Sequence, residues 1–146
     1  MFKKECCEKL APCALTLLRV VVGIIMAAHG WQKASDIAAW TSNLTQMGIP
    51  LPEINAYLSI AGELLGGLGL LFGLITPVAA FGIASTMVVA ICQVHLANGL
   101  FAKDGGFEYP LTLLSVAIFF IFNGAGPYSL DAKLSQKFGC CKKTEG

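Results

Sequence analysis

Residues 56–75 read AYLSIAGELLGGLGLLFGLI, and Glu63 is the single charged side chain in this run. A helix needs about 20 predominantly apolar residues to cross the ~30 Å hydrocarbon core of a bilayer. The chain has four stretches of this kind, at residues 11–34, 54–75, 78–97 and 109–126. Because they take up more than half of the 146 residues, the sequence predicts an all-α fold, an integral membrane four-helix bundle.

The composition agrees with that fold class and excludes others. Hydrophobic residues make up 55% of the chain and charged residues only 13%, whereas about a quarter of the residues in a soluble domain are charged. The net charge is +1, so the chain lacks the strongly basic character of a nucleic-acid-binding protein. We therefore expect the lipid bilayer, and no nucleic acid, to be its partner.

The distribution of lysines predicts the orientation of the bundle. Three lysines precede the first apolar stretch and four follow the last, while the first and third connections carry one each, Lys33 and Lys103. Basic flanks of membrane helices stay in the cytoplasm, so both termini are expected there, which an even number of crossings allows. The predicted organisation is a cytoplasmic tail at residues 1–10, a membrane domain at 11–134 and a second cytoplasmic tail at 135–146.

Two short interfacial helices are expected outside the spans. The first is capped by Ser35 or Asp36, ends at Gly48 and has one apolar face made of Ile37, Trp40, Leu44 and Met47. A plain loop is the alternative for this segment. The second follows Ser129 and has an apolar line of Leu130, Leu134 and Phe138 flanked by lysines, as in a helix that lies on a membrane surface.

Glycines recur at helical spacing in the second span. They fall on one stripe of the helix, at Gly62, Gly66, Gly69 and Gly73. Stripes of small residues let membrane helices approach closely, because packing there replaces the hydrophobic effect. The tight turn at Thr76-Pro77 follows, so the second and third spans are expected to pack as an antiparallel hairpin.

Two charged residues lie well inside the predicted spans, away from their ends, where an isolated charge is costly. Arg19 is about two turns into the first span, and Glu63 is near the middle of the second. At 1.5 Å per residue we expect their depths to differ by less than ~10 Å, so the sequence predicts an Arg19–Glu63 pair, direct or through water. The pair either fixes the helix register alone or marks a site at which Glu63 titrates or binds a ligand.

A second set of polar residues lies toward the outer ends of the spans. It consists of His29, Gln32, Gln93, His95 and Glu108. This asymmetry indicates a cavity open to the outer face or the outer leaflet, although Glu108 has an alternative role in capping the fourth helix. The histidines lack HxxxH or HxxE spacing, and the cysteine pairs lack the CxxC spacing of zinc sites, so no metal site is predicted.

Several segments also occur in the order found in a known family. They are Leu18-Arg19 with Gly23, His29-Gly30-Trp31-Gln32-Lys33, Met47-Gly48-Ile49-Pro50, Glu63-Leu64-Leu65-Gly66-Gly67, Gly73-Leu74-Ile75-Thr76-Pro77, His95-Leu96-Ala97-Asn98-Gly99-Leu100-Phe101, Gly105-Gly106-Phe107-Glu108-Tyr109-Pro110-Leu111 and Gly126-Pro127-Tyr128-Ser129-Leu130-Asp131. Over about residues 15–134 the chain resembles the DoxX family of small bacterial four-helix inner-membrane proteins. The resemblance implies that fold and that location.

The resemblance also implies a link to redox work. One group of relatives resembles the membrane subunit of a thiosulfate:quinone oxidoreductase, and another joins a superoxide dismutase and a sulfurtransferase in a membrane complex. We therefore expect a membrane subunit that contacts either quinone or a partner oxidoreductase. No covalently bound cofactor is expected. The candidate ligand-binding or proton-exchange residues are Arg19, His29, Glu63, His95 and Glu108.

An alternative function comes from a different class. The same polar residues would lock four helices together in a non-enzymatic membrane scaffold, or in a protein that binds a small solute. The sequence specifies neither the ligand nor the oligomeric state.

Overall fold

The computed structural model describes residues 4–138, and these residues form helices joined by turns, with no strand among them. The elements are α1 (Lys4–Ser35), α2 (Ile37–Gln46), α3 (Pro52–Ile60), the π-helix η1 (Ala61–Leu65), α4 (Gly66–Phe72), α5 (Thr76–Ala90), the π-helix η2 (Ile91–His95), the 3₁₀ turns η3 (Leu96–Asn98) and η4 (Ala102–Asp104), α6 (Glu108–Asn123) and α7 (Leu130–Phe138). The predicted all-α fold is confirmed.

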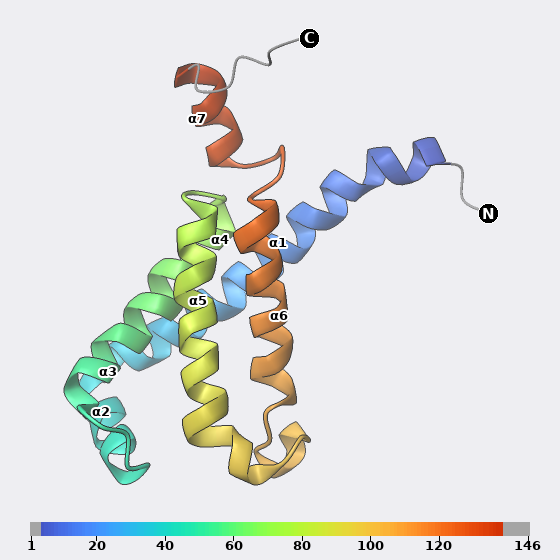
Figure 1. Cartoon of the computed structure of the whole chain (residues 1–146). Helices are drawn as coiled ribbons and strands as arrows, with labels where there is room; N and C mark the ends of the chain where they lie inside the picture. The colour runs from blue at the N-terminus through green and yellow to red at the C-terminus, as the bar shows by residue number, and fades with distance from the viewer. Residues whose placement is uncertain (1–3, 139–146) are drawn as a thin grey trace.

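Within residues 4–138, three continuous helical runs are long and apolar enough to cross a membrane. They are Leu10–Ser35, Pro52–Phe72 and Thr76–Asn98. The fourth apolar helix, α6, has 16 residues and is therefore about 24 Å long at 1.5 Å per residue. It runs beside α5 over most of its length (Figure 1). The chain is thus a membrane helical bundle, as its sequence predicts, with α6 as its shortest member.

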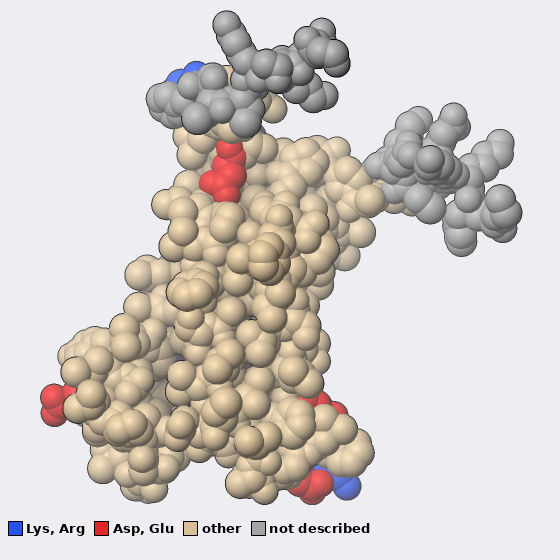
Figure 2. All heavy atoms as spheres, viewed as in Figure 1, with Lys and Arg blue, Asp and Glu red and all other residues tan. Residues whose placement is uncertain are grey.

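The bundle has two distinct ends (Figure 1). We call one the turn end, because the tight turn between α4 and α5 lies there at residues 73–75, together with the end of α6 and the start of α7. We call the other the loop end, where α2 and the connection between α5 and α6 lie. Charged side chains gather at the two ends, and the surface between them in this view is uncharged (Figure 2). This distribution fits a hydrocarbon layer around the middle of the bundle.

The main core lies where α1, α4, α5 and α6 meet. Its largest fully buried side chains are Phe120, Met26, Leu70 and Ile83. Ala80 of α5 and Ala117 of α6 are also fully buried, and such small residues let membrane helices approach one another closely. A smaller cluster of Leu44, Ile49 and Ala56, with Trp40 against it, joins α2 to α3 at the loop end.

Both short helices predicted from the sequence are present. Asp36, and not Ser35, caps α2, because its Oδ1 accepts a hydrogen bond of 2.9 Å from the Ala39 backbone N–H. Ser129 caps α7 in the same way, accepting from the Ala132 backbone N–H at 3.1 Å. These caps fix α2 at the loop end and α7 at the turn end.

The glycines of the second span lie against α5. A Cβ added to Gly66 would come within 2.8 Å of the Ala79 carbonyl oxygen, and one added to Gly62 within 2.9 Å of the Gly82 oxygen. A Cβ added to Gly69 would come within 2.6 Å of the Ala79 side chain. The α3–α4 segment and α5 therefore approach as closely as their backbones allow.

Gly73 has a different role from the other three. Its φ of +64° is left-handed, a conformation that glycine adopts without steric cost, and it ends α4. A Cβ at this position would come within 2.7 Å of the Arg19 guanidinium and 2.5 Å of the Ser129 side chain. Gly73 therefore belongs to the turn end and not to the α4–α5 contact.

Candidate functional site

Arg19 lies at the turn end, where it binds backbone oxygens. Its Nη1 donates to the carbonyls of Leu70 and Leu71, at 2.6 and 2.8 Å, and its Nη2 donates to the Tyr128 carbonyl at 2.8 Å. The first two oxygens are near the end of α4, where helical carbonyls lack partners and a cation is favourable. The predicted Arg19–Glu63 pair is therefore wrong, and Arg19 joins α1 to α4 and to the segment before α7.

Asp131 strengthens the same end of the bundle. Its two carboxylate oxygens accept hydrogen bonds from the backbone N–H groups of Ile75 and Thr76, at 2.7 and 2.9 Å, at the start of α5. Ile75 has a φ of +48°, an unfavourable conformation for a β-branched residue. The Asp131 contacts hold this strained turn in place, so the polar residues at the turn end have structural roles.

Glu63 pairs instead with Lys33, at the opposite end of α1. The Lys33 Nζ lies 2.5 Å from Glu63 Oε1. Glu63 is only 4% exposed, and the side chain of Lys33 is 20% exposed. The buried Glu63 Oε2 has no hydrogen-bond partner among the described residues. Glu63 is therefore a buried carboxyl group with one of its two oxygens unused.

Aromatic and hydroxyl groups complete the surroundings of this pair. The Lys33 Nζ lies 4.4 Å from the centroid of the Trp40 ring, a distance at which a cation is attracted to the face of an aromatic ring. The Trp40 Nε1–H donates to Ser59 Oγ at 2.9 Å. Glu63 itself lies in η1, a single π-helical turn, and such turns are frequent at functional sites. The half of the bundle nearer the loop end thus has a polar cluster made of Lys33, Trp40, Ser59 and Glu63, which we call the headgroup cluster.

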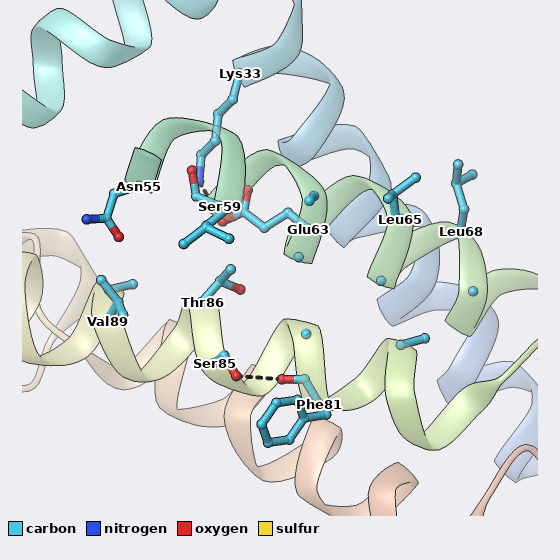
Figure 3. Close-up of a pocket in the computed structure, with 18 of the residues that line it drawn as sticks. Lys33, Asn55, Ser59, Glu63, Leu65, Leu68, Phe81, Ser85, Thr86 and Val89 are labelled. Atoms are coloured by element: carbon cyan, nitrogen blue, oxygen red, sulfur yellow. Dashed lines mark hydrogen bonds and ion pairs between the residues drawn. The ribbon is translucent and has the colours of Figure 1, made fainter. Parts of the chain in front are cut away.

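The headgroup cluster lines a long groove between the second span and α5. The groove has a volume of about 1100 Å³. Figure 3 shows Lys33, Ser59 and Glu63 on one side of it and Thr86 and Val89 of α5 on the other. Toward the turn end its lining is apolar and includes Leu65, Leu68, Phe72, Val78 and Phe81. The polar side chains of the groove therefore all lie in its loop-end half, and its turn-end half is apolar.

His95 lines the same groove from η2. Its Nδ1 lies 2.6 Å from the Gly105 carbonyl oxygen. A carbonyl oxygen only accepts, so Nδ1 carries the hydrogen in the neutral ring and Nε2 is left as an acceptor. The structure therefore brings two of the predicted site residues, Glu63 and His95, to one groove.

His29 and Glu108 lie elsewhere. His29 lies beside Tyr109 of α6, with their ring centroids 6.3 Å apart, in a separate shallow pocket that also includes Gln32. Glu108 is the first residue of α6, and its Oε1 accepts from the Ala102 backbone N–H at 2.7 Å. Glu108 thus holds the connection between α5 and α6, and the five candidate residues do not share one cavity.

Three members of the headgroup cluster, Lys33, Trp40 and Ser59, were not among the ligand contacts expected from the sequence. Lys33 could have been found from its position, because it is the one lysine in the first connection and lies on the same stripe of α1 as Arg19. The register of α1 against the second span decides which of the two basic residues reaches Glu63. That register depends on the close contacts of Gly23, Gly30 and Gly67 with the facing helix backbone, and the positions of charged residues do not reveal these contacts.

Comparison with known proteins identifies relatives over most of the chain. The model of the DoxX family matches residues 14–96. A protein named putative oxidoreductase CatD, from Bacillus subtilis, is 36% identical over 68% of this chain and 72% of its own length. An uncharacterized protein of Haemophilus influenzae is 31% identical over 89% of this chain and 97% of its own. The inner membrane protein YqjF of Escherichia coli is 27% identical over 90% and 99%, respectively. No solved structure matches the chain.

Proposed function

The chain belongs to the DoxX family of membrane proteins, and we propose that it is a redox-associated subunit of a bacterial inner membrane that binds an isoprenoid quinone in the groove between α3–α4 and α5. The observation that carries the proposal is the polarity of the groove, polar at the loop end and apolar toward the turn end. A quinone has the same division, with a polar ring and a long apolar tail.

The dimensions of the groove support this ligand class. It extends from Asn55 near the loop end to Leu74 near the turn end, which is about 29 Å along the second span at 1.5 Å per residue. Several of its apolar side chains, including Leu65, Phe72 and Phe81, are more than half exposed at the surface of the bundle. A ligand dissolved in the bilayer can therefore enter the groove sideways from the lipid.

The headgroup cluster and His95 supply the polar contacts. The Lys33 ammonium donates to a carbonyl oxygen of the ring, and Glu63 and His95 accept from its hydroxyl groups in the reduced form. Reduction of a quinone takes up two electrons and two protons. The electrons come from a partner oxidoreductase, and the residues of this chain hold the ring and exchange its protons. The printed name of the CatD relative, putative oxidoreductase, supports a redox role.

A second function, that of a non-enzymatic scaffold or a small-solute binding protein, is favoured by the turn end. Arg19 makes all three of its hydrogen bonds to backbone oxygens, and Asp131 accepts from backbone N–H groups. These contacts serve helix packing alone. The scaffold function predicts that the groove holds ordinary membrane lipid.

The quinone content of the purified protein separates the two functions. The full chain is purified in mild detergent, its lipids are extracted, and quinone is quantified per protein against the same ratio in the whole membrane. Quinone binding predicts enrichment in the parent and in Glu53→Gln, which removes an exposed carboxylate outside the groove, and loss of enrichment in folded Glu63→Leu. Quinone at the bulk membrane ratio in the parent would contradict the proposal.

A further inference from the structure

The unpartnered oxygen of Glu63 specifies the ligand of the groove more narrowly. Glu63 is buried, lines the groove and has one oxygen, Oε1, bound to Lys33. Its Oε2 is buried without a hydrogen-bond partner among the described residues. Buried polar groups in native proteins are almost always hydrogen-bonded, so this oxygen requires a donor that the described part of the chain does not supply.

The chemistry of that donor follows from the ion pair. Beside the Lys33 ammonium, Glu63 is a carboxylate, and a carboxylate is an acceptor only. The terminal torsion of a glutamate is soft and two-fold, so a small turn of the carboxyl group brings Oε2 to a ligand in the groove while Lys33 stays in contact. The ligand must then present an O–H or N–H group at its polar end.

This requirement distinguishes the two redox forms of a quinone. The oxidised ring has carbonyl oxygens, which are acceptors, and would place an oxygen with no hydrogen against the carboxylate. The reduced ring has hydroxyl groups, and one of them can donate to Glu63. We infer that the headgroup cluster selects the hydroquinone form over the quinone form, through a hydrogen bond from a ring hydroxyl to Glu63. This inference rests on the proposed function.

His95 supports the same selection from the facing segment. Its Nδ1 is engaged by the Gly105 carbonyl oxygen, which leaves Nε2 of the neutral ring as an acceptor. Glu63 and His95 are thus both acceptors on one groove, and a hydroxyl group complements either of them where a carbonyl oxygen does not. Lys33 remains a donor in the cluster, so we expect the quinone form to bind as well, more weakly.

Three matched ligands test the selection. Decylhydroquinone, its dimethyl ether and decylbenzoquinone share a ring and a tail and differ in their hydrogen-bond donors. They are titrated anaerobically into the full chain in lipid nanodiscs. The chain has two tryptophans, so Trp31→Phe leaves Trp40 of the headgroup cluster as the reporter of binding. Calorimetry on the unmodified chain checks that this replacement does not alter affinity.

We expect decylhydroquinone to bind at least about tenfold more tightly than the other two ligands, a ratio that corresponds to ~1.4 kcal/mol. In Glu63→Gln the amide both donates and accepts, so the preference should disappear, while Glu53→Gln should keep it. Equal affinity of the hydroquinone and its dimethyl ether, or of the hydroquinone and the quinone, would overturn the inference and leave the proposed function standing. Failure of all three ligands to bind would overturn both.

Discussion

Lys33 and Glu63 form an ion pair of 2.5 Å that joins the last turn of α1 to the π-helical turn in the middle of the second span. The contact lies where α1 and the second span cross in close approach. A Cβ on Gly30 would come within 2.6 Å of the Leu64 backbone. The pair therefore links the helix register to the polar end of the groove.

The ion pair predicts energetic coupling between its two residues. Lys33→Met and Glu63→Gln should each destabilise the protein by up to ~3 kcal/mol. This value is at the low end of the range for buried pairs, because Lys33 is partly exposed. The double variant should lose less than the sum of the two, with a coupling energy of about 1–3 kcal/mol. Unfolding of the four proteins in detergent measures this cycle. Losses that add within ~0.5 kcal/mol would show that the two residues do not interact.

Arg19 should behave as an independent structural residue. Hydrogen bonds to charged groups are worth about 1.5–3 kcal/mol each, so Arg19→Met should cost at least ~3 kcal/mol. Arg19→Lys should recover only part of this, because an ammonium lacks the planar fork that reaches three carbonyls. Leu17→Met, an exposed position on the same helix, serves as the control. When Arg19→Met is combined with Glu63→Gln, the two losses of unfolding free energy should add. A coupling energy above ~1 kcal/mol would show that Arg19 and Glu63 interact after all.

Two glycines at the contact between the second span and α5 provide a matched comparison. In Gly66→Ala the new Cβ meets the Ala79 backbone oxygen at 2.8 Å, which cannot move cheaply, whereas in Gly82→Ala the nearest atom is 3.5 Å away. Overpacking costs about 1–3 kcal/mol, so the first variant should melt at a clearly lower temperature in detergent and the second should melt like the parent. The same melting temperature for both variants would contradict the close α4–α5 approach.

The orientation of the chain stays a prediction of the lysine distribution. Cys140 and Cys141 lie outside the described residues, and so do the side chains of Cys6 and Cys7. In a background with Cys13 and Cys92 replaced by serine, these thiols should react with an impermeant reagent in inverted vesicles and not in intact cells. Reaction of either pair in intact cells would show that the orientation is reversed or that the chain does not cross the membrane four times.

Much of the fold follows from the sequence because its physical cause is local. The apolar stretches give the helices, Asp36 and Ser129 cap the short ones, and glycines at helical spacing mark a close contact. The predicted span at 109–126 is longer than α6, which ends at Asn123 because Gly124 has a φ of +67°. A positive φ at one glycine depends on the chain that follows, and apolarity alone does not reveal it.

The site was predicted less well, because it depends on the register between helices. A depth estimate from sequence puts Arg19 within reach of Glu63 only if each helix is upright and independently centred in the bilayer. In the structure α1 crosses obliquely and extends beyond the bundle at its start (Figure 1). Gly23 meets Leu71 and Gly30 meets Leu64, which places Arg19 beside the turn after α4 and leaves Glu63 to Lys33. This register is set by how the side chains of two helices fit together across their contact. The sequence of either helix alone does not determine it.

The most direct test of the groove as a quinone site is photolabelling in native membranes. A quinone with a photoreactive group on its ring is illuminated in membranes that contain the full chain, and the modified peptides are mapped. We expect labelling to be concentrated at residues 55–63 and 86–95, to be competed by unlabelled quinone, and to fall in folded Glu63→Leu but not in Glu53→Gln. Labelling spread evenly over the lipid-facing surfaces of α1 and α6, with no competition, would contradict it.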